Sequence, residues 1–298
     1  QMLVGNSLLQ DRIAILENGE LIEYFYVKKS EKNCLGNIYK GRVTNILPGI
    51  QAAFVDVGMS KNAYLYIDSL LSNKYLSEKQ IKKAEVKNIN NVIKKGEELL
   101  VQVLREPLGE KNASVTTDVS LSGKYTVLVP GNMQIGISKK ITDEKERKRL
   151  KEIGEQIILN NKGIIFRTFS QGKDIAEIKQ DYRALVSKYI KIEESYKYSF
   201  APKLLYKDNI LLEKAIKDYV DDTIHEIYVE DDKTKKKVDE LLKNINTNIR
   251  TKVKVFTDYF NLFEYFKVEK QIEKLIEKKV KLKSGGSIII EKTEALTV

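Results

Sequence analysis

The chain has 298 residues and a formal net charge of +10, and 42% of its residues are hydrophobic. This length predicts about two to four domains. The positive charge fits a polyanionic partner, nucleic acid or an anionic membrane, and fits equally a Lys-rich surface without one. No apolar run approaches about 18 residues, which excludes a membrane-spanning helix, and no signal peptide is visible.

The chain carries one cysteine, Cys34, and one histidine, His225. An intrachain disulfide and a zinc site of several Cys and His ligands are therefore excluded, and a reducing cytoplasm is the expected location. His225 is interpreted as an ordinary structural or surface residue. Any hydrolytic chemistry would have to use carboxylates and a hard metal such as magnesium.

The first predicted element is a β-hairpin over residues 12–29, because Asn18 and Gly19 separate two alternating apolar runs. Five further strands and one polar helical stretch follow, which is the order of a small Greek-key barrel. The strands are predicted within residues 36–47, 51–58, 62–67 and, around a turn at 107–112, within 97–121; the helical stretch is predicted over residues 77–95.

A second unit is predicted to alternate strands with helices. Residues 124–130 and 134–141 have β-character, residues 142–161 predict a helix with a Thr-led or Asp-led start, and residues 163–172 predict a buried strand. A long amphipathic helix is predicted after residue 172, and further helices and strands fill the chain to its end.

The barrel segment carries rings and cations that suit single-stranded nucleic acid. Phe54 and Tyr64 fall on adjacent predicted strands. Bases stack on such rings while cations follow the backbone. The cations that could line this face are Lys40, Arg42, Lys61 and Lys111. The same rings could instead fill the barrel core, and the pattern alone leaves both interpretations open.

Several segments in consistent order carry a family resemblance. "GNIYKGRVTNILPGIQAAFVDVG" begins at Gly36, "REPLGEKNASVTTDVSL" begins at Arg105, and "IIFRT" and "SGGSIIIEKTEAL" follow further on. By these segments the chain is identified as a member of the ribonuclease E/G family, nearer its G branch. The resemblance covers nearly all of the chain.

The resemblance implies an α+β multidomain fold, in which a split RNase H-like domain surrounds two others. The first is an OB-fold barrel of the ribosomal S-one type, which binds RNA, and the second is an α/β 5′-sensor domain. The expected segments are 1–35 for the first RNase H-like part, 36–118 for the barrel, 119–212 for the sensor, 213–280 for the second RNase H-like part and 281–298 for the start of a DNase I-like catalytic domain.

The resemblance also assigns RNA-binding positions in the barrel. Phe54, Tyr64 and Lys111 match positions that the family uses to hold single-stranded RNA, and Lys40 and Arg42 are expected to assist them. Tyr64 stands where Phe is common in the E branch. The turn before the last barrel strand differs as well, because Asn112 stands where Gly is usual.

In the sensor segment, Arg167 and Thr168 match the pair that grips a 5′-terminal monophosphate. A guanidinium fork suits a phosphate because it binds two oxygens at once, and a hydroxyl adds a further donor. Gly123, Val127 and Lys139 match positions that line the same pocket. Lys139 replaces an Arg of the E branch, which puts a bidentate contact there in doubt.

No residue of the chain is assigned a catalytic role. The family holds magnesium with two Asp side chains of its catalytic domain and zinc with a Cys pair, and both sets match positions beyond Val298. The carboxylates that do not match the magnesium ligands are Asp56, Asp68, Asp118, Asp221 and Asp222. The chain by itself is therefore expected to have no cofactor and no nuclease activity. Because Gln1 precedes Met2 and the chain stops just after a strand, we also expect a piece of a longer protein.

The function expected from these residues is recognition within an endoribonuclease of RNA processing and decay. The expected partner is single-stranded RNA with a 5′-monophosphate. No membrane partner is expected. The full-length protein is left as a possible homo-oligomer. The alternative is a stand-alone RNA-binding protein that has no nuclease activity.

Overall fold

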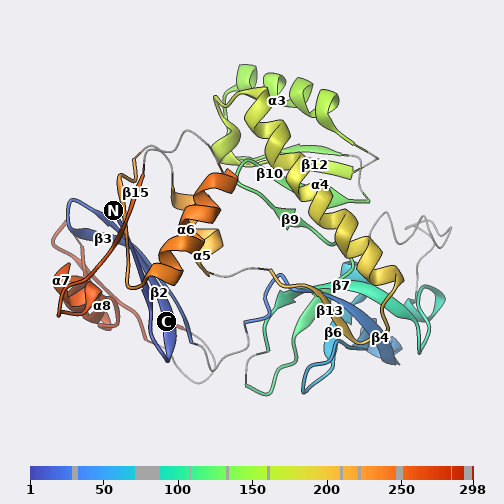
Figure 1. Ribbon diagram of the computed structural model, residues 1–298. Coiled ribbons are helices and arrows are strands. Elements are labelled where there is room, and N and C mark those ends of the chain that lie inside the picture. Colours follow the sequence, from blue (N-terminus) through green and yellow to red (C-terminus); the bar gives the residue numbers. More distant parts are fainter. Residues whose placement is uncertain are drawn as a thin grey trace. The chain divides into compact units, whose positions relative to one another are not determined.

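The computed structural model describes the chain except residues 29–32, 71–87, 108, 132–133, 160–161, 209–210, 221–222, 246–250, 283 and 292–296. Two compact units make up the fold. One combines Gln1–Lys32 with Asn209–Val298, and the other is Asn33–Asp208. The first unit therefore contains both ends of the chain, which are drawn in blue and in orange to red in Figure 1.

The first unit contains a five-stranded sheet of order β15-β14-β1-β2-β3. Strands β1, β2 and β3 are consecutive antiparallel neighbours, whereas β14 runs parallel to β1 and β15 parallel to β14. These strands are β1 (Met2–Asn6), β2 (Gln10–Glu17), β3 (Glu20–Lys28), β14 (Glu226–Val229) and β15 (Lys252–Val255). A separate hairpin pairs β16 (Lys279–Lys281) with β17 (Ser287–Ile289).

Helices pack on both faces of this sheet because alternate residues of β1 and β2 are apolar on both sides. Met2 and Val4 pack with α5 (Leu211–Tyr219) and α6 (Asp232–Ile245). Leu3, between them, packs on the other face with α7 (Leu262–Tyr265) and the start of α8 (Val268–Leu275). Strands buried on both faces lack the polar alternation of a half-exposed sheet.

The predicted hairpin is confirmed, with β2 and β3 joined by Asn18 and Gly19. Both residues have positive φ, of 52° and 83°. This left-handed conformation at both central positions matches the right-handed twist of the flanking strands, and Asn and Gly adopt it at little cost.

The second unit contains the predicted barrel, whose strands follow the order β4-β5-β6-β8-β7, with β7 pairing back to β4. The pairing of β6 with β8 is parallel and the other barrel pairings are antiparallel. The strands are β4 (Ile38–Leu47), β5 (Ala52–Asp56), β6 (Ala63–Tyr66), β7 (Glu98–Arg105) and β8 (Ser114–Thr116). A closed five-stranded barrel of this kind is typical of an OB-like domain.

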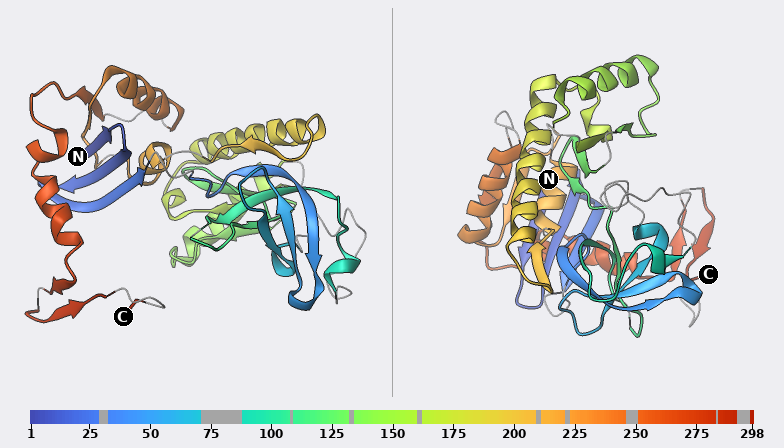
Figure 2. Two further views of the ribbon diagram at one scale, coloured as in Figure 1. Left: turned by 90° about the horizontal axis from the view of Figure 1, so that it is seen from below. Right: turned by 90° about the vertical axis from the view of Figure 1, so that its right-hand side faces the viewer.

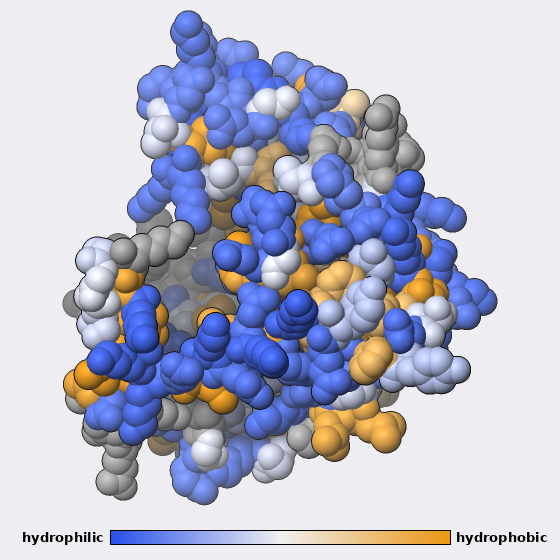
Figure 3. Space-filling view, turned by 90° about the vertical axis from the view of Figure 1, so that its left-hand side faces the viewer, coloured by the Kyte–Doolittle hydropathy of each residue, from blue (hydrophilic) through white to orange (hydrophobic). Residues whose placement is uncertain are grey.

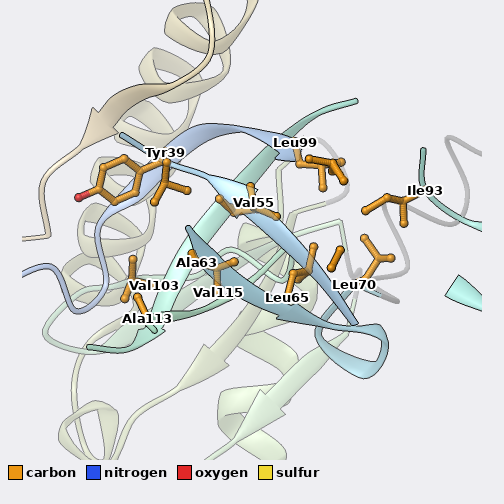
Figure 4. Close-up of a cluster of buried hydrophobic side chains, with 14 of the residues drawn as sticks. Tyr39, Val55, Ala63, Leu65, Leu70, Ile93, Leu99, Val103, Ala113 and Val115 are labelled. Carbon is orange, nitrogen blue, oxygen red and sulfur yellow. The ribbon is translucent and has the colours of Figure 1, made fainter. Parts of the chain in front are cut away.

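Figure 4 shows the core of this barrel, where apolar side chains from all five strands meet. Tyr39 belongs to this core and is 8% exposed. Short elements complete the barrel: η1 (Pro48–Ile50), α1 (Ile67–Leu70) and η3 (Ile89–Asn91). The helix predicted over residues 77–95 falls largely on residues 71–87, which lie outside the described residues.

The rest of the second unit is the predicted α/β unit, built on a sheet of order β11-β12-β10-β9. Its elements are β9 (Leu121–Ser122), β10 (Thr126–Pro130), β11 (Ile135–Ile137), α3 (Glu144–Ile157), β12 (Lys162–Phe166), η4 (Thr168–Ser170) and α4 (Ile175–Lys197). Both helices cover one face of the sheet and share its core. Asp143 caps α3 by accepting a hydrogen bond from the backbone N–H of Lys145. The two views of Figure 2 show the length of α4, drawn in yellow.

The chain continues from α4 into β13 (Lys203–Tyr206), which pairs with the first part of β4. Helix α4 and strand β13 thus join the α/β unit to the barrel within the second unit. Figure 3 shows one face of the protein, on which hydrophilic side chains dominate and hydrophobic ones lie between them.

Candidate nucleic-acid interface

Three aromatic rings form a cluster on the outer surface of the barrel. Phe54 lies on β5, and Tyr64 and Tyr66 lie two residues apart on β6. The centroids of Phe54 and Tyr64 are 5.5 Å apart with the rings edge to face, and those of Tyr64 and Tyr66 are 4.4 Å apart. We call these three residues the ring cluster.

The strand alternation puts the ring cluster outside the core. Val55 and Leu65, the neighbours of Phe54 and Tyr64, are 0% exposed inside the barrel. Successive side chains of a strand point to opposite faces, so the rings point outward, and Tyr66 is 50% exposed. The sequence left open whether the rings fill the barrel core or form an exposed stacking surface. In the structure they lie on the outer face.

Hydrogen bonds connect the ring cluster to the turn that carries Lys111. The backbone N–H of Tyr64 donates to the carbonyl oxygen of Ala113 at 2.7 Å. The side-chain amide of Asn112 donates to the carbonyl oxygen of Asn62 at 2.8 Å. This amide attaches the turn to the start of the strand that carries Tyr64. Lys111 is exposed beside it.

Tyr64 of the ring cluster stays uncharged at neutral pH because its pKa is raised. Partial burial raises the pKa of the Tyr64 hydroxyl above its ordinary value, and the neighbouring hydroxyl of Tyr66 raises it further. A neutral phenol next to the site does not repel a phosphodiester backbone, so the ring can stack on a base.

The structure does not place Lys40 on this exposed surface. Its ammonium donates to the carbonyl oxygens of Tyr196 and Ser199 at 3.0 and 2.8 Å and lies 2.9 Å from the Glu98 carboxylate. Lys40 is 7% exposed. The contact of Lys40 with RNA stays a prediction; in this structure its charge is compensated inside the protein, where it holds the end of α4 against the barrel.

Arg42 lies two residues further along β4, and its side chain is 48% exposed. Its guanidinium donates to Glu98 at 2.8 Å. Hydrogen bonds from Arg42 and then from Lys40 lower the pKa of Glu98 to about 2. Arg42 thus stays accessible to solvent while its orientation is fixed by Glu98. Lys61, also predicted to line the barrel, pairs with Glu110 at 2.8 Å.

Four of the predicted sensor residues lie at one end of the α/β sheet: Gly123, Lys139, Arg167 and Thr168. Arg167 directly follows β12, and its Nη1 donates to the carbonyl oxygen of Gly123 at 2.7 Å. Because β11 runs parallel to β12, Ser138 ends beside Arg167 and Thr168. The hydroxyls of Ser138 and Thr168 lie 3.4 Å apart. Lys139 follows Ser138 and is exposed.

A carboxylate that the sequence did not single out organises the loop at Gly123. Asp181 of α4 accepts hydrogen bonds from the backbone N–H groups of Lys124, Tyr125 and Thr126 at 3.0, 3.1 and 2.9 Å. A Cβ built on Gly123 would overlap the same carboxylate. Glycine is therefore required at this position by close approach.

Val127 has a different position from the other predicted sensor residues. Its neighbour Leu128 is 0% exposed in the core beneath α3 and α4. By strand alternation Val127 points to the opposite face of the sheet, opposite Ile165 of β12, which is 40% exposed. The two residues give that face an apolar surface next to the strand end that carries Arg167.

Two residues of this arrangement could not be identified from the sequence, Asp181 and Ser138. Asp181 is one of many charged residues on an amphipathic helix, and Ser138 is one hydroxyl after a short strand. Neither has a local pattern that distinguishes it. Both acquire a role because the fold brings them to the end of β12.

Across the part of the chain that the structure describes, no group of three or more His, Cys, Asp or Glu side chains is placed to hold a metal ion. None of the described helices has the length and apolar character needed to cross a membrane. His225 is exposed and directly precedes β14.

Known proteins resemble this chain along its length. Ribonuclease G of Escherichia coli (strain K12) is 34% identical over 298 residues, which cover 100% of this chain and 61% of that protein. Ribonuclease G of Haemophilus influenzae is also 34% identical, with the same coverage. Ribonuclease E of Buchnera aphidicola subsp. Schizaphis graminum is 33% identical over 302 residues, which are 31% of its length.

The chain thus spans about three fifths of the length of the ribonuclease G relatives, with 61% of each covered. The model of the family described as "Ribonuclease E/G family" matches residues 120–298, more than half of the chain. The match includes the α/β sheet with Arg167 and every later element. The chain belongs to the ribonuclease E/G family.

Proposed function

We propose that this chain holds single-stranded RNA on the ring cluster of its barrel and reads a 5′-terminal monophosphate at Arg167. The observation that carries the proposal is the ring cluster itself, three neighbouring aromatic side chains on the outside of an OB-like barrel. Such barrels bind unpaired strands by stacking bases on rings, with cations along the backbone. Lys111 and Arg42 are the cations that we assign to this face.

The proposed monophosphate pocket is the end of β12. Arg167 and Thr168 would donate to the phosphate oxygens, and Lys139 would add a positive charge. The loop of Gly123 lies against the Arg167 guanidinium, and Val127 would line the apolar side. Binding of phosphate by several donors at once favours a terminal phosphate, which presents more oxygens than an internal one.

The proposed domain assignment follows the family. The sheet of the first unit, which takes strands from both ends of the chain, supports a split RNase H-like domain. Residues 36–118 are then the RNA-binding barrel and residues 119–212 the 5′-sensor domain. Residues 281–298 would begin the DNase I-like domain. The whole protein would hold magnesium in that domain and would hold zinc through a Cys pair.

We assign the cleavage step to that whole protein, an endoribonuclease of RNA processing and decay. The chain itself is proposed to bind RNA without cutting it. Incubation of a labelled single-stranded oligonucleotide with the chain and magnesium should leave the RNA intact. Cleavage that EDTA suppresses would refute this part of the proposal.

The binding role is tested at Tyr64. Tyr64→Ala should weaken binding of single-stranded RNA about 5-fold to 150-fold, since each base stacked on a ring contributes about 1–3 kcal/mol. Tyr64→Phe should keep the affinity because the ring remains. Fluorescence anisotropy with an unstructured RNA measures both. Equal affinities of Tyr64→Ala and the unmutated chain would remove the basis of the proposal.

A further inference from the structure

Two aromatic side chains outside the ring cluster are almost fully exposed in the second unit. Tyr198 and Phe200 lie in the turn between α4 and β13, and each is 87% exposed. Ser199, between them, is 8% exposed. Two neighbouring exposed rings present an aromatic surface that a binding partner could cover.

The turn is held in place from beneath. The buried ammonium of Lys40 donates to the carbonyl oxygen of Ser199 at 2.8 Å, and the Ser199 hydroxyl donates to the carbonyl oxygen of Ser195 at 2.6 Å. The hydroxyl of Tyr196 donates to the carbonyl oxygen of Glu98 at 3.0 Å. Because the backbone between the two rings is fixed, little conformational entropy is lost when the rings bind.

The turn also continues the surface of the ring cluster. Glu98 joins the two regions, since its carboxylate lies 2.9 Å from the Lys40 ammonium and accepts a hydrogen bond from Arg42 at 2.8 Å. In the strand register Arg42 lies opposite Asp56 of β5, and Asp56 lies two residues beyond Phe54 on the same face of its strand. The outer face of β4 and β5 therefore leads from the ring cluster past Arg42 to the turn.

The charge of the turn favours a polyanion over an apolar partner. Lys197 is exposed immediately before the aromatic pair and Lys203 is exposed three residues after it, and Arg42 is half exposed on the same path. Rings flanked by cations are the arrangement that stacks bases while neutralising their phosphates.

We propose that Tyr198 and Phe200 form a second stacking platform, on which an RNA strand bound at the ring cluster continues toward the end of α4. This inference rests on the proposed function of the ring cluster. It extends the binding path beyond the barrel strands and assigns Lys40 as a positioning residue for the turn. The proposed ligand of this platform is unpaired RNA, and the affinity measured in the test should depend on the length of that RNA.

The test compares two unstructured, labelled RNAs of about 4 and about 16 nucleotides, the range of site sizes of one OB fold. The double variant Tyr198→Ala with Phe200→Ala should weaken binding of the longer RNA about tenfold or more and leave the shorter one unchanged. The pair Tyr198→Phe with Phe200→Tyr should bind both like the unmutated chain. Ile190→Ala, at a residue of α4 that is 40% exposed, is the matched control and should change neither affinity.

The same assay separates this inference from the proposed function. Tyr64→Ala should weaken binding of both RNAs; if it weakens neither, the ring-cluster proposal fails. If Tyr64→Ala weakens both and the double Ala variant weakens neither, only the second platform is refuted. A double Ala variant that changes the sedimentation coefficient of the free chain while RNA affinity is kept would assign the turn to protein association and overturn the inference.

Discussion

The Nη1 atom of Arg167 donates a hydrogen bond of 2.7 Å to the carbonyl oxygen of Gly123. The backbone N–H of Arg167 also donates to the carbonyl oxygen of Tyr125 at 2.8 Å. A guanidinium has five donors in one plane, so the bond to Gly123 uses one donor and restrains the orientation of the group. The loop of Gly123 and the side chain of Arg167 therefore act as one unit.

The first prediction concerns recognition of the terminal phosphate. Arg167→Ala should reduce the preference for 5′-monophosphate over 5′-hydroxyl RNA about 10-fold to 150-fold, because hydrogen bonds to charged groups contribute about 1.5–3 kcal/mol. The ratio of the two dissociation constants measures the preference. Arg183→Ala, at an exposed arginine of α4, should keep the ratio. Equal affinities for the two RNAs in the unmutated chain would refute the pocket.

The second prediction concerns the space at Gly123. Gly123→Ala should lower the free energy of unfolding by about 1–3 kcal/mol and reduce the monophosphate preference, because the added methyl overlaps the Asp181 carboxylate. Affinity for 5′-hydroxyl RNA should not change. Denaturant titration and anisotropy measure the two effects. Gly49→Ala is the matched control, since a Cβ there meets nothing within 4 Å.

The third prediction separates the two basic residues of β4. Lys40→Met should lower the free energy of unfolding by about 1–3 kcal/mol, because it leaves two carbonyl oxygens and Glu98 without the ammonium donor. The dependence of RNA affinity on salt should keep its slope. Lys111→Gln should reduce that slope by about 1, the effect of one lost phosphate contact. A reduced slope for Lys40→Met would show that Lys40 contacts a phosphate after all.

The fourth prediction concerns acid stability. Hydrogen bonds from Arg42 and Lys40 lower the pKa of Glu98 from 4.5 to about 2. A carboxylate with a lowered pKa in the folded state stabilises the fold above its ordinary pKa, and this contribution is lost as the pH falls toward the folded pKa. The free energy of unfolding should therefore fall between about pH 4.5 and about pH 2.

Glu98→Gln should flatten this pH dependence in part. Glu226, whose pKa is also lowered to about 2 through its hydrogen bond from Lys254, should retain a share of it. Denaturant unfolding at a series of pH values measures the slope. Glu194→Gln, at an exposed glutamate of α4, is the control. An unchanged slope in Glu98→Gln would contradict the assignment.

Local patterns predicted the strands of the barrel and the hairpin at Asn18 and Gly19. They could not decide which face of β5 points inward, since Phe54 and its neighbours Ala53 and Val55 are all apolar. Closure of the barrel decides this, because the side chains that face one another inside must fit a small volume. Small Ala53 and Val55 fill it, and the larger Phe54 lies outside.

The basic residues show the same limit. Lys40 and Arg42 are two residues apart on one strand and share its outer face, so the sequence treats them alike. The end of α4 packs on one and leaves the other half exposed. The two carbonyl oxygens that Lys40 contacts belong to residues that follow it by 156 and 159 positions in the chain. No local sequence pattern encodes such a separation.

The sequence by itself determined the elements, the barrel and the family, because alternation, turn residues and ordered motifs act over short stretches of chain. Only the tertiary structure decided that the rings face outward, that Lys40 is compensated inside the protein, and that Asp181 shapes the loop beside Arg167. These outcomes depend on which distant segments pack together. Burial and charge pairing between such segments depend on the positions of atoms in space.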